Sequence, residues 1–248
     1  MIPVASLVLG TVKQGLPAYG YGSTSRPTAQ ESLAVITAAK RARIKLFDTA
    51  LGYGDAMALL AHAEVPRNRW IVKSRLPLRI SQPWLYHAWL IHNPTLAEIA
   101  WDRAIPPRCG VSVYTVDETV AGTRFAPPVQ APASCLNPPV SVDFARAPFL
   151  QGVLIRDPAS APAGLQRAVR AFQALADDAG VSRVALALHS AHRRADGFLV
   201  FGVSSVAQLD TVLEAADQTV PADLIDAARD LATTVDATAA LPSLWSRS

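Results

Sequence analysis

Residues 28 to 48 read TAQESLAVITAAKRARIKLFD and combine a helical pattern with the short apolar run that follows it. Thr28 and Glu31 form a capping box, which marks the start of a helix, and apolar residues then recur at helical spacing. The run Lys45-Leu46-Phe47 predicts a buried strand directly after this helix. This stretch therefore predicts one helix followed by one strand of an α/β fold.

Short apolar runs of this kind recur along the chain and alternate with helical patterns, which is typical of β/α units. Eight runs predict strands: Leu7-Val8-Leu9, Lys45-Leu46-Phe47, Trp70-Ile71-Val72, Trp89-Leu90-Ile91, Gly110-Val111-Ser112-Val113, Pro128-Val129-Gln130, Val140-Ser141-Val142 and Phe198-Leu199-Val200-Phe201. Helices are predicted over about Thr28 to Arg43, Leu165 to Ala179, Ser182 to Ala191, Ser205 to Ala216 and Ala222 to Thr234. A chain of 248 residues matches one (β/α)8 barrel, the TIM barrel, so we expect a single domain over residues 1–248.

Two connections between strands are too short or too rich in proline to carry a crossover helix. We expect no α-helix over Ser74 to Pro83, which holds Pro77, or over Leu136 to Pro139. The barrel should therefore lack outer helices after strands 3 and 6. Strand faces left open in this way favour a homodimer that covers one gap.

Composition narrows the class of protein. Half of the residues are hydrophobic and 17% are charged, as in ordinary globular proteins. The net charge of +3 comes from scattered Lys and Arg with few aromatic residues between them, so we expect no nucleic-acid partner. No apolar run approaches the roughly 18 residues of a membrane span, so we expect a cytoplasmic protein without a membrane partner. Cys109 and Cys135 have neither metal nor redox spacing, which predicts reduced thiols and no metal site.

Polar residues follow three of the predicted strands directly. The strands that end at residues 47, 72 and 91 are followed by Asp48, Lys73 and His92, and Tyr53 lies just beyond the first of these. Each residue alone has a structural interpretation, such as a turn cap, a surface ring, a solvated lysine or a core histidine. Functional groups of a parallel barrel converge at the carboxyl ends of its strands, however. Together the four residues therefore predict one active site.

The segments around these residues resemble the aldo-keto reductases, whose catalytic tetrad is Asp, Tyr, Lys and His. The segments that carry this resemblance are LVLGT (7–11), FDTALGYG (47–54), IVK (71–73), LIHNP (90–94), GVS (110–112), FLQG (149–152) and GVSS (202–205). They follow one another in the family's order and cover nearly the whole chain. The resemblance is thus one of the complete barrel.

The resemblance implies an NADPH- or NADH-dependent carbonyl reductase that acts on a small aldehyde, ketone or sugar-like substrate. Tyr53 would donate a proton to the carbonyl oxygen as hydride arrives from the nicotinamide. Lys73 would lower the pKa of Tyr53, and Asp48 would hold Lys73 in place. His92 would orient the carbonyl oxygen by a hydrogen bond.

The resemblance also implies cofactor contacts from Ser112, Gln130, Gly202, Ser204 and Gln208. The last three belong to a capped helix start, which is suited to binding a phosphate. Relatives that prefer NADPH often have Lys or Arg where this chain has Gly202 and Gln208. We therefore expect little preference for NADPH over NADH.

Several residues depart from the family pattern. Val113 and Val212 replace asparagines, and Arg146 stands where many relatives stack an aromatic or hydroxyl-bearing residue on the nicotinamide. A cofactor-independent acid/base enzyme, such as an isomerase, dehydratase or cyclase, therefore remains an alternative. A non-catalytic binding subunit on the same fold is a third. The loop from Lys13 to Pro27 is either a lid over the pocket or a flexible surface loop.

Overall fold

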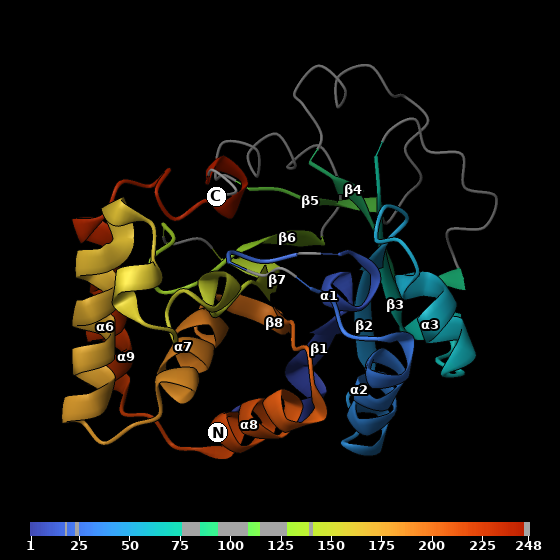
Figure 1. Ribbon diagram of the computed structural model, residues 1–248, viewed down its shortest axis with the longest axis horizontal. Coiled ribbons are helices and arrows are strands. Elements are labelled where there is room, and N and C mark those ends of the chain that lie inside the picture. The colour runs from blue at the N-terminus through green and yellow to red at the C-terminus, as the bar shows by residue number, and fades with distance from the viewer. Residues whose placement is uncertain are drawn as a thin grey trace.

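The computed structural model describes residues 1–17, 19–22, 25–75, 85–93, 109–114, 128–138 and 141–245. Eight parallel strands close into a barrel in chain order, with helices packed around part of its outside (Figure 1). The strands are β1 (Leu7–Gly10), β2 (Leu46–Ala50), β3 (Trp70–Ser74), β4 (Ala88–His92), β5 (Cys109–Ser112), β6 (Val129–Pro132), β7 (Val142–Arg146) and β8 (Ala195–Phe201). The predicted (β/α)8 barrel is confirmed.

One predicted strand was placed too early in the chain. The prediction of Val140 to Val142 overlaps β7 only at its last residue. The strand continues to Arg146 because Phe144 and Arg146 pair in parallel register with Gln130 and Pro132 of β6. Residues 143–146, in which Asp143 and Arg146 flank Phe144 and Ala145, lay outside the apolar run on which the prediction rested. The other seven predictions each share at least two residues with the observed strand.

The helices are α1 (Val12–Gly15), α2 (Ala29–Arg41), α3 (Ala56–His62), α6 (Gln166–Asp178), α7 (Arg183–His192), α8 (Val206–Asp217) and α9 (Ala222–Asp230). All five predicted helices are confirmed, and the Thr28–Glu31 capping box opens α2. The sequence did not predict α1 and α3, because both are short and neither has a side-chain cap. In the described part of the chain, no helix is long and apolar enough to cross a membrane.

Two apolar clusters hold the barrel together. A small one fills its interior and consists of Val8, Leu46, Ile71, Ala88, Leu90, Phe144 and Val200. A larger one lies between the strands and the surrounding helices, and includes fully buried Phe47, Phe172 and Phe201. Successive side chains of a strand point to opposite faces. Residues two positions beyond the interior cluster therefore face the same interior, closer to the carboxyl ends of the strands.

The link after β6 shows how the barrel does without a helix. Its described residues, 133–138, form turns and no helix, as predicted; Pro139 lies outside the described residues. The buried Arg194 donates hydrogen bonds to the carbonyl oxygens of Ser134 (2.9 Å), Asn137 and Pro138 (3.2 Å). The guanidinium thus satisfies carbonyl groups that a helix would satisfy internally. The other segment predicted to lack a helix, Ser74 to Pro83, lies outside the described residues beyond Arg75.

Candidate active site

A cavity of about 680 Å³ lies at the carboxyl ends of the barrel strands. Asp48 in the middle of β2, Lys73 near the end of β3 and His92 at the end of β4 are part of its wall. Tyr53, from the turn after β2, lines the same wall. The structure therefore brings together all four residues that the sequence predicted as catalytic, and we refer to them as the tetrad.

The strand geometry explains why polar groups collect here. Four cavity residues lie two positions after an apolar residue of the interior cluster: Asp48 after Leu46, Lys73 after Ile71, His92 after Leu90 and Arg146 after Phe144. Since side chains alternate along a strand, each polar residue faces the barrel interior directly above the apolar layer. The barrel thus has an apolar floor and a polar upper layer.

A buried ion pair forms the centre of this polar layer. The Lys73 Nζ lies 2.6 Å from the Asp48 Oδ1, and both residues are about 3% exposed or less. The Gln130 Nε2 donates to the Asp48 Oδ2 at 2.8 Å, and the Gln130 Oε1 accepts from Lys73 at 3.1 Å. Both carboxylate oxygens are therefore satisfied, which a buried ion pair requires to be tolerated.

Ser112 and Gln130, which the sequence predicted to contact a cofactor, are hydrogen-bonded to each other in this structure, and Gln130 is also hydrogen-bonded to the ion pair. Both are fully buried and lie beneath the wall rather than among the residues that line the cavity. The Ser112 hydroxyl donates to the Gln130 Oε1 at 2.9 Å, so both atoms of the Gln130 amide are used inside the protein. In this structure the two residues support the ion pair.

Tyr53 is held as a neutral phenol. Burial is the main cause that raises its pKa above the ordinary value, and the Asp48 carboxylate raises it further, while Arg146 acts in the opposite direction. The Lys73 Nζ lies 5.2 Å from the Tyr53 ring centroid and 2.6 Å from the Asp48 carboxylate. The net shift of the Tyr53 pKa is upward, whereas the sequence predicted a lowering by Lys73. The phenol instead stays protonated and ready to donate.

Two glycines allow the backbone of Tyr53 to reach its position. A Cβ on Gly15, the last residue of α1, would lie 1.7 Å from the Tyr53 carbonyl oxygen. Gly54 has a φ of +49°, and a Cβ there would lie 2.4 Å from the Gly15 carbonyl oxygen. Helix α1 and the turn after β2 therefore pack backbone to backbone, which fixes where Tyr53 enters the cavity.

His92 is a neutral imidazole at the edge of the ion pair. Burial lowers its pKa to about 3, and the positive charges of Lys73, Arg146 and Arg75 contribute. Its ring meets the Tyr53 ring edge-to-face, with the centroids 6.1 Å apart. A neutral imidazole has one N–H donor and one acceptor. It can therefore donate one hydrogen bond to a carbonyl oxygen without carrying charge.

The start of α8 forms another part of the wall. Gly202, Ser204 and Gln208 line the cavity, as expected for the predicted phosphate contacts. The Ser205 hydroxyl accepts from the Gln208 backbone N–H at 3.2 Å, and the Gln208 Oε1 accepts from the Ser204 backbone N–H at 2.7 Å. The Gln208 side chain must therefore give up this hydrogen bond before an anion can reach the Ser204 N–H.

Cations that the sequence did not single out complete this region. Lys13, on α1, and Arg156 line the same cavity as the start of α8. A helix N-terminus in a cavity that also holds two further cations suits the phosphates of a dinucleotide. The start of α8 and these cations therefore fit the phosphates of a dinucleotide. The Gln130 amide, which was predicted to contact the cofactor, is hydrogen-bonded to Lys73 and Asp48.

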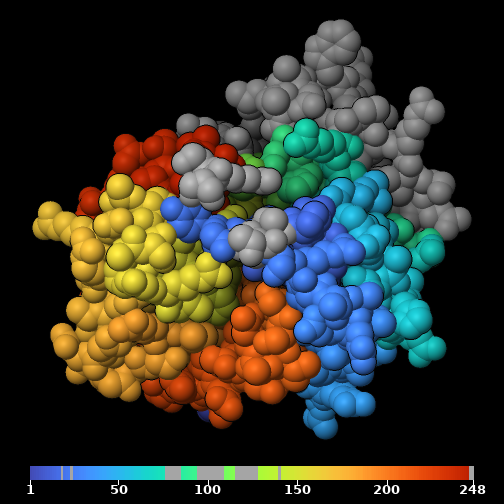
Figure 2. All heavy atoms as spheres, in the orientation of Figure 1, coloured from blue at the N-terminus to red at the C-terminus, as the bar shows by residue number. Residues whose placement is uncertain are grey.

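The described part of the loop after β1 forms part of the cavity wall, which favours the lid interpretation of that loop. Tyr19 and Gly20 line the cavity, and the Tyr21 carbonyl accepts from Arg156 at 2.7 Å. The Tyr21 ring packs edge-to-face on Trp245, with centroids 5.0 Å apart. In Figure 2 blue atoms of this loop lie beside the yellow segment after β7. Contacts from distant parts of the chain thus hold the loop over the cavity.

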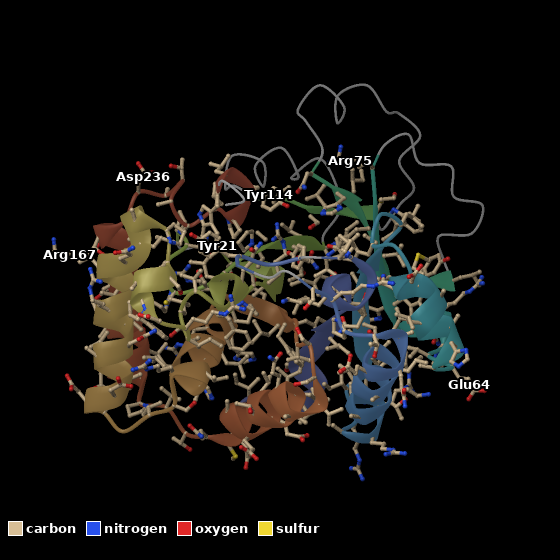
Figure 3. The ribbon with its side chains drawn as sticks, viewed as in Figure 1. Tyr21, Glu64, Arg75, Tyr114, Arg167 and Asp236 are labelled. Atoms are coloured by element: carbon tan, nitrogen blue, oxygen red, sulfur yellow. The ribbon has the colours of Figure 1, made fainter. Side chains whose placement is uncertain are left out.

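The cavity wall also carries polar residues outside the tetrad. Arg75, Tyr114 and Arg146 line the cavity, and Figure 3 shows Arg75, Tyr114 and Tyr21 along the same side of the barrel. Arg146 follows the interior residue Phe144 by two positions, as Asp48 follows Leu46. The sequence noted Arg146 only as a departure from the family pattern.

The cysteines take no part in the cavity. Cys109 and Cys135 are free and buried, and burial raises the pKa of each thiol to about 12. Among the described residues, no group of three or more His, Cys, Asp or Glu side chains is placed to hold a metal ion.

No protein-family profile matches the sequence, and no curated protein matches it at a significant level. Solved structures do match. The glycerol dehydrogenase of Gluconobacter oxydans has a TM-score of 0.63 and 17% identity, covering 94% of this chain and 92% of that one. The chain has the fold of the aldo-keto reductases.

Two further structures agree with this fold. An aldo-keto reductase of Bacillus halodurans, in its holo form, has a TM-score of 0.64 and 16% identity, over 94% of this chain and 92% of that one. A thermostable aldo-keto reductase solved with the inhibitor epalrestat has a TM-score of 0.58 and 17% identity, over 93% and 95%. The aldo-keto reductase fold therefore extends over nearly the whole chain.

Proposed function

We propose that the protein is a carbonyl reductase that uses NADPH or NADH to reduce a small aldehyde or ketone. The observation that carries this proposal is the buried Asp48–Lys73 ion pair with Tyr53 and His92 beside it on one cavity wall. The shared fold supports the proposal, but fold alone does not fix chemistry.

The four residues divide the work of the reaction. The nicotinamide, when bound, supplies a hydride to the carbonyl carbon. Tyr53 donates its phenol proton to the carbonyl oxygen, so that the carbonyl becomes an alcohol. His92 donates a hydrogen bond that orients the same oxygen. The nearby Lys73 cation stabilises the phenolate that remains until solvent returns a proton.

Groups at the α8 end of the cavity would hold the cofactor. Lys13 and Arg156, with the backbone at Gly202 and Ser204, present positive charge and N–H groups suited to phosphates. Neither Gly202 nor Gln208 offers a cation for a 2'-phosphate. The proposal therefore includes both NADPH and NADH as cofactors.

A cofactor-independent acid/base enzyme is the second candidate. The observation that favours it is that Gln130 and the Ser204 N–H, both assigned to a cofactor by the family resemblance, are already hydrogen-bonded within the protein. Tyr53 would then donate and recover a proton in an isomerisation, dehydration or cyclisation, with no change in oxidation state.

Titration with NADPH and with NADH, followed by nicotinamide fluorescence, separates these candidates. We expect saturable binding and cofactor oxidation when a panel of aldehydes and ketones is added. Tyr53→Phe should bind the cofactor but lose turnover, whereas Tyr86→Phe, which alters a ring packed against Trp70 and Trp89, should retain both. Absence of cofactor binding by the folded wild-type protein would contradict the proposal and leave the acid/base enzyme or a non-catalytic subunit.

A further inference from the structure

We infer that the substrate of this site is an anionic carbonyl compound whose carboxylate or phosphate group binds to Arg146. This inference rests on the proposed function, because it assigns the substrate class of the same cavity. Nothing in the tetrad itself requires a charged substrate, so the inference depends on the cavity wall outside the tetrad.

The charge of the cavity favours an anionic ligand. Its described wall carries five cationic side chains and one carboxylate: Lys13, Lys73, Arg75, Arg146 and Arg156 against Asp48. Such an excess of cationic over anionic side chains concentrates anionic ligands.

The contacts of the Arg146 side chain also favour an anionic ligand. Its Nη2 donates to the Val113 carbonyl oxygen at 2.9 Å, and its Cζ lies 4.7 Å from the Tyr114 ring centroid. Its Nε is buried without a hydrogen-bond partner. Among the described residues no carboxylate lies within 4 Å of the guanidinium, unlike the pairs formed by Arg26, Arg183 and Arg229.

These contacts fix the orientation of the guanidinium but do not compensate its charge. One hydrogen bond and one ring contact use a small part of its five N–H donors. A half-buried cation of this kind is stabilised when an anion joins it, and the planar guanidinium suits a carboxylate or phosphate. Arg146 is therefore prepared for a negatively charged group.

Arg146 differs from Lys13 and Arg156 in the groups that it influences. Arg146 lies close enough to the tetrad for its charge to lower the pKa of both Tyr53 and His92. Lys13 and Arg156 influence one another, and Arg156 is bound to the loop after β1. Arg146 therefore belongs to the part of the cavity where the carbonyl reacts, and the other two remain for the cofactor.

A pair of substrates of equal shape tests this assignment. The carboxylate of 4-carboxybenzaldehyde and the nitro group of 4-nitrobenzaldehyde have nearly the same size, but only the first is an anion. Arg146→Met should lower kcat/KM for the carboxylate by about 10- to 100-fold, as expected for a lost hydrogen-bonded charge pair, and change the nitro compound by less than about 3-fold. Glyceraldehyde 3-phosphate and glyceraldehyde form the matched pair for a phosphate group.

Arg156→Met is the control, because it removes another cation from the same cavity. It should leave the ratio of anionic to neutral substrate unchanged. If Arg146→Met lowers kcat/KM equally for charged and neutral substrates, Arg146 has only a structural role and the inference fails while the reductase proposal stands. The inference also fails if Arg156→Met, rather than Arg146→Met, changes the ratio.

Calorimetry without cofactor distinguishes this inference from the proposed function. The probes are the alcohols 4-(hydroxymethyl)benzoate and glycerol 3-phosphate, with 4-nitrobenzyl alcohol as the neutral control. If no carbonyl is reduced but one anionic alcohol binds and loses about 10- to 100-fold in affinity in Arg146→Met, the anion site stands and the reductase proposal falls. If neither anionic alcohol shows an affinity that depends on Arg146, the anion site is excluded whatever the reductase assays give.

Discussion

The tetrad and the start of α8 face the same cavity, but their polar groups are used differently. In the tetrad, the Asp48–Lys73 pair is buried and supported by Gln130, while the functional atoms of Tyr53 and His92 remain available to a substrate. At the start of α8, the exposed Gln208 side chain satisfies the Ser204 N–H. The tetrad is built around a buried ion pair, whereas the start of α8 is an exposed helix start that the side chain of Gln208 caps.

This difference predicts that substitutions at the two ends of the cavity have effects of different size. Removing one partner of a buried ion pair strongly destabilises the protein, because it leaves the other charge buried and uncompensated. A helix cap contributes about 1 kcal/mol and can be exchanged for a ligand. We therefore expect substitutions in the tetrad to have large effects, and changes at the start of α8 to have small ones.

The largest expected effect is that of Tyr53→Phe, which removes only the proton donor. Turnover should fall by about 10²- to 10⁴-fold, as is typical for the loss of a positioned acid. Steady-state kinetics on the true substrate, with thermal melting to verify the fold, measure this. If near-full activity remains, the tetrad does not carry the chemistry.

Lys73→Met should reduce turnover to a similar extent and also destabilise the protein. It leaves the Asp48 carboxylate buried without its cation, which should cost about 3–5 kcal/mol in the free energy of unfolding. Adding Asp48→Asn should recover much of this stability but not the activity. Denaturant unfolding of the single and double variants tests this. Equal stability of wild type and Lys73→Met would show that the pair is not buried in solution.

Gly15→Ala tests whether α1 positions Tyr53. The added Cβ would overlap the Tyr53 carbonyl oxygen, so the backbone there must move. A displacement of about 1 Å in a catalytic group can cost about 100-fold, so kcat should fall strongly while cofactor affinity changes little. Gly180→Ala is a control for backbone strain, because its φ is +64° but no atom lies within 4 Å of the added Cβ. Equal loss of kcat in both variants would argue against a positioning role.

Discrimination between the two cofactors should be weak. The dissociation constants of NADPH and NADH should differ by less than about 100-fold, or roughly 2.7 kcal/mol, because Gly202 and Gln208 supply no cation for the 2'-phosphate. Lys13 and Arg156 would serve the pyrophosphate that both cofactors share. A larger preference for NADPH would show that one of these two cations contacts the 2'-phosphate instead.

The pH dependence should be the smallest effect. His92 becomes charged only as the pH falls through about 3, and Tyr53 loses its proton only above the ordinary range for tyrosine. The kcat/KM for reduction should therefore be flat between about pH 5 and 9. An inflection near the ordinary histidine pKa that disappears in His92→Gln would show that the imidazole titrates during the reaction.

The fold and the tetrad were readable from the sequence because both depend on local spacing. The two-residue alternation that makes Leu46 an interior residue also makes Asp48 face the cavity, and a strand end is visible as the end of an apolar run. The approximate place of His92 followed in the same way.

Features that depend on distant contacts were not readable. The hydrogen bonds from Arg194 to the link after β6 span about 60 residues, so no local pattern in the sequence predicts them. The partners of Gln130 and the direction of the Tyr53 pKa both follow from burial, which the sequence does not give. The position of Arg146 in the cavity wall depends on the bounds of β7, which the sequence placed too early.

The proposed function requires that hydride passes from the nicotinamide to a carbonyl beside the tetrad. Transfer of deuterium from labelled NADPH to the product measures this step. Wild-type protein is mixed with NADPH deuterated at the transferring position and an aldehyde that it consumes, and the product is analysed by mass spectrometry. The account predicts an alcohol with one deuterium on the former carbonyl carbon, formed far more slowly by Tyr53→Phe. An unlabelled product that forms equally well without the cofactor would contradict it.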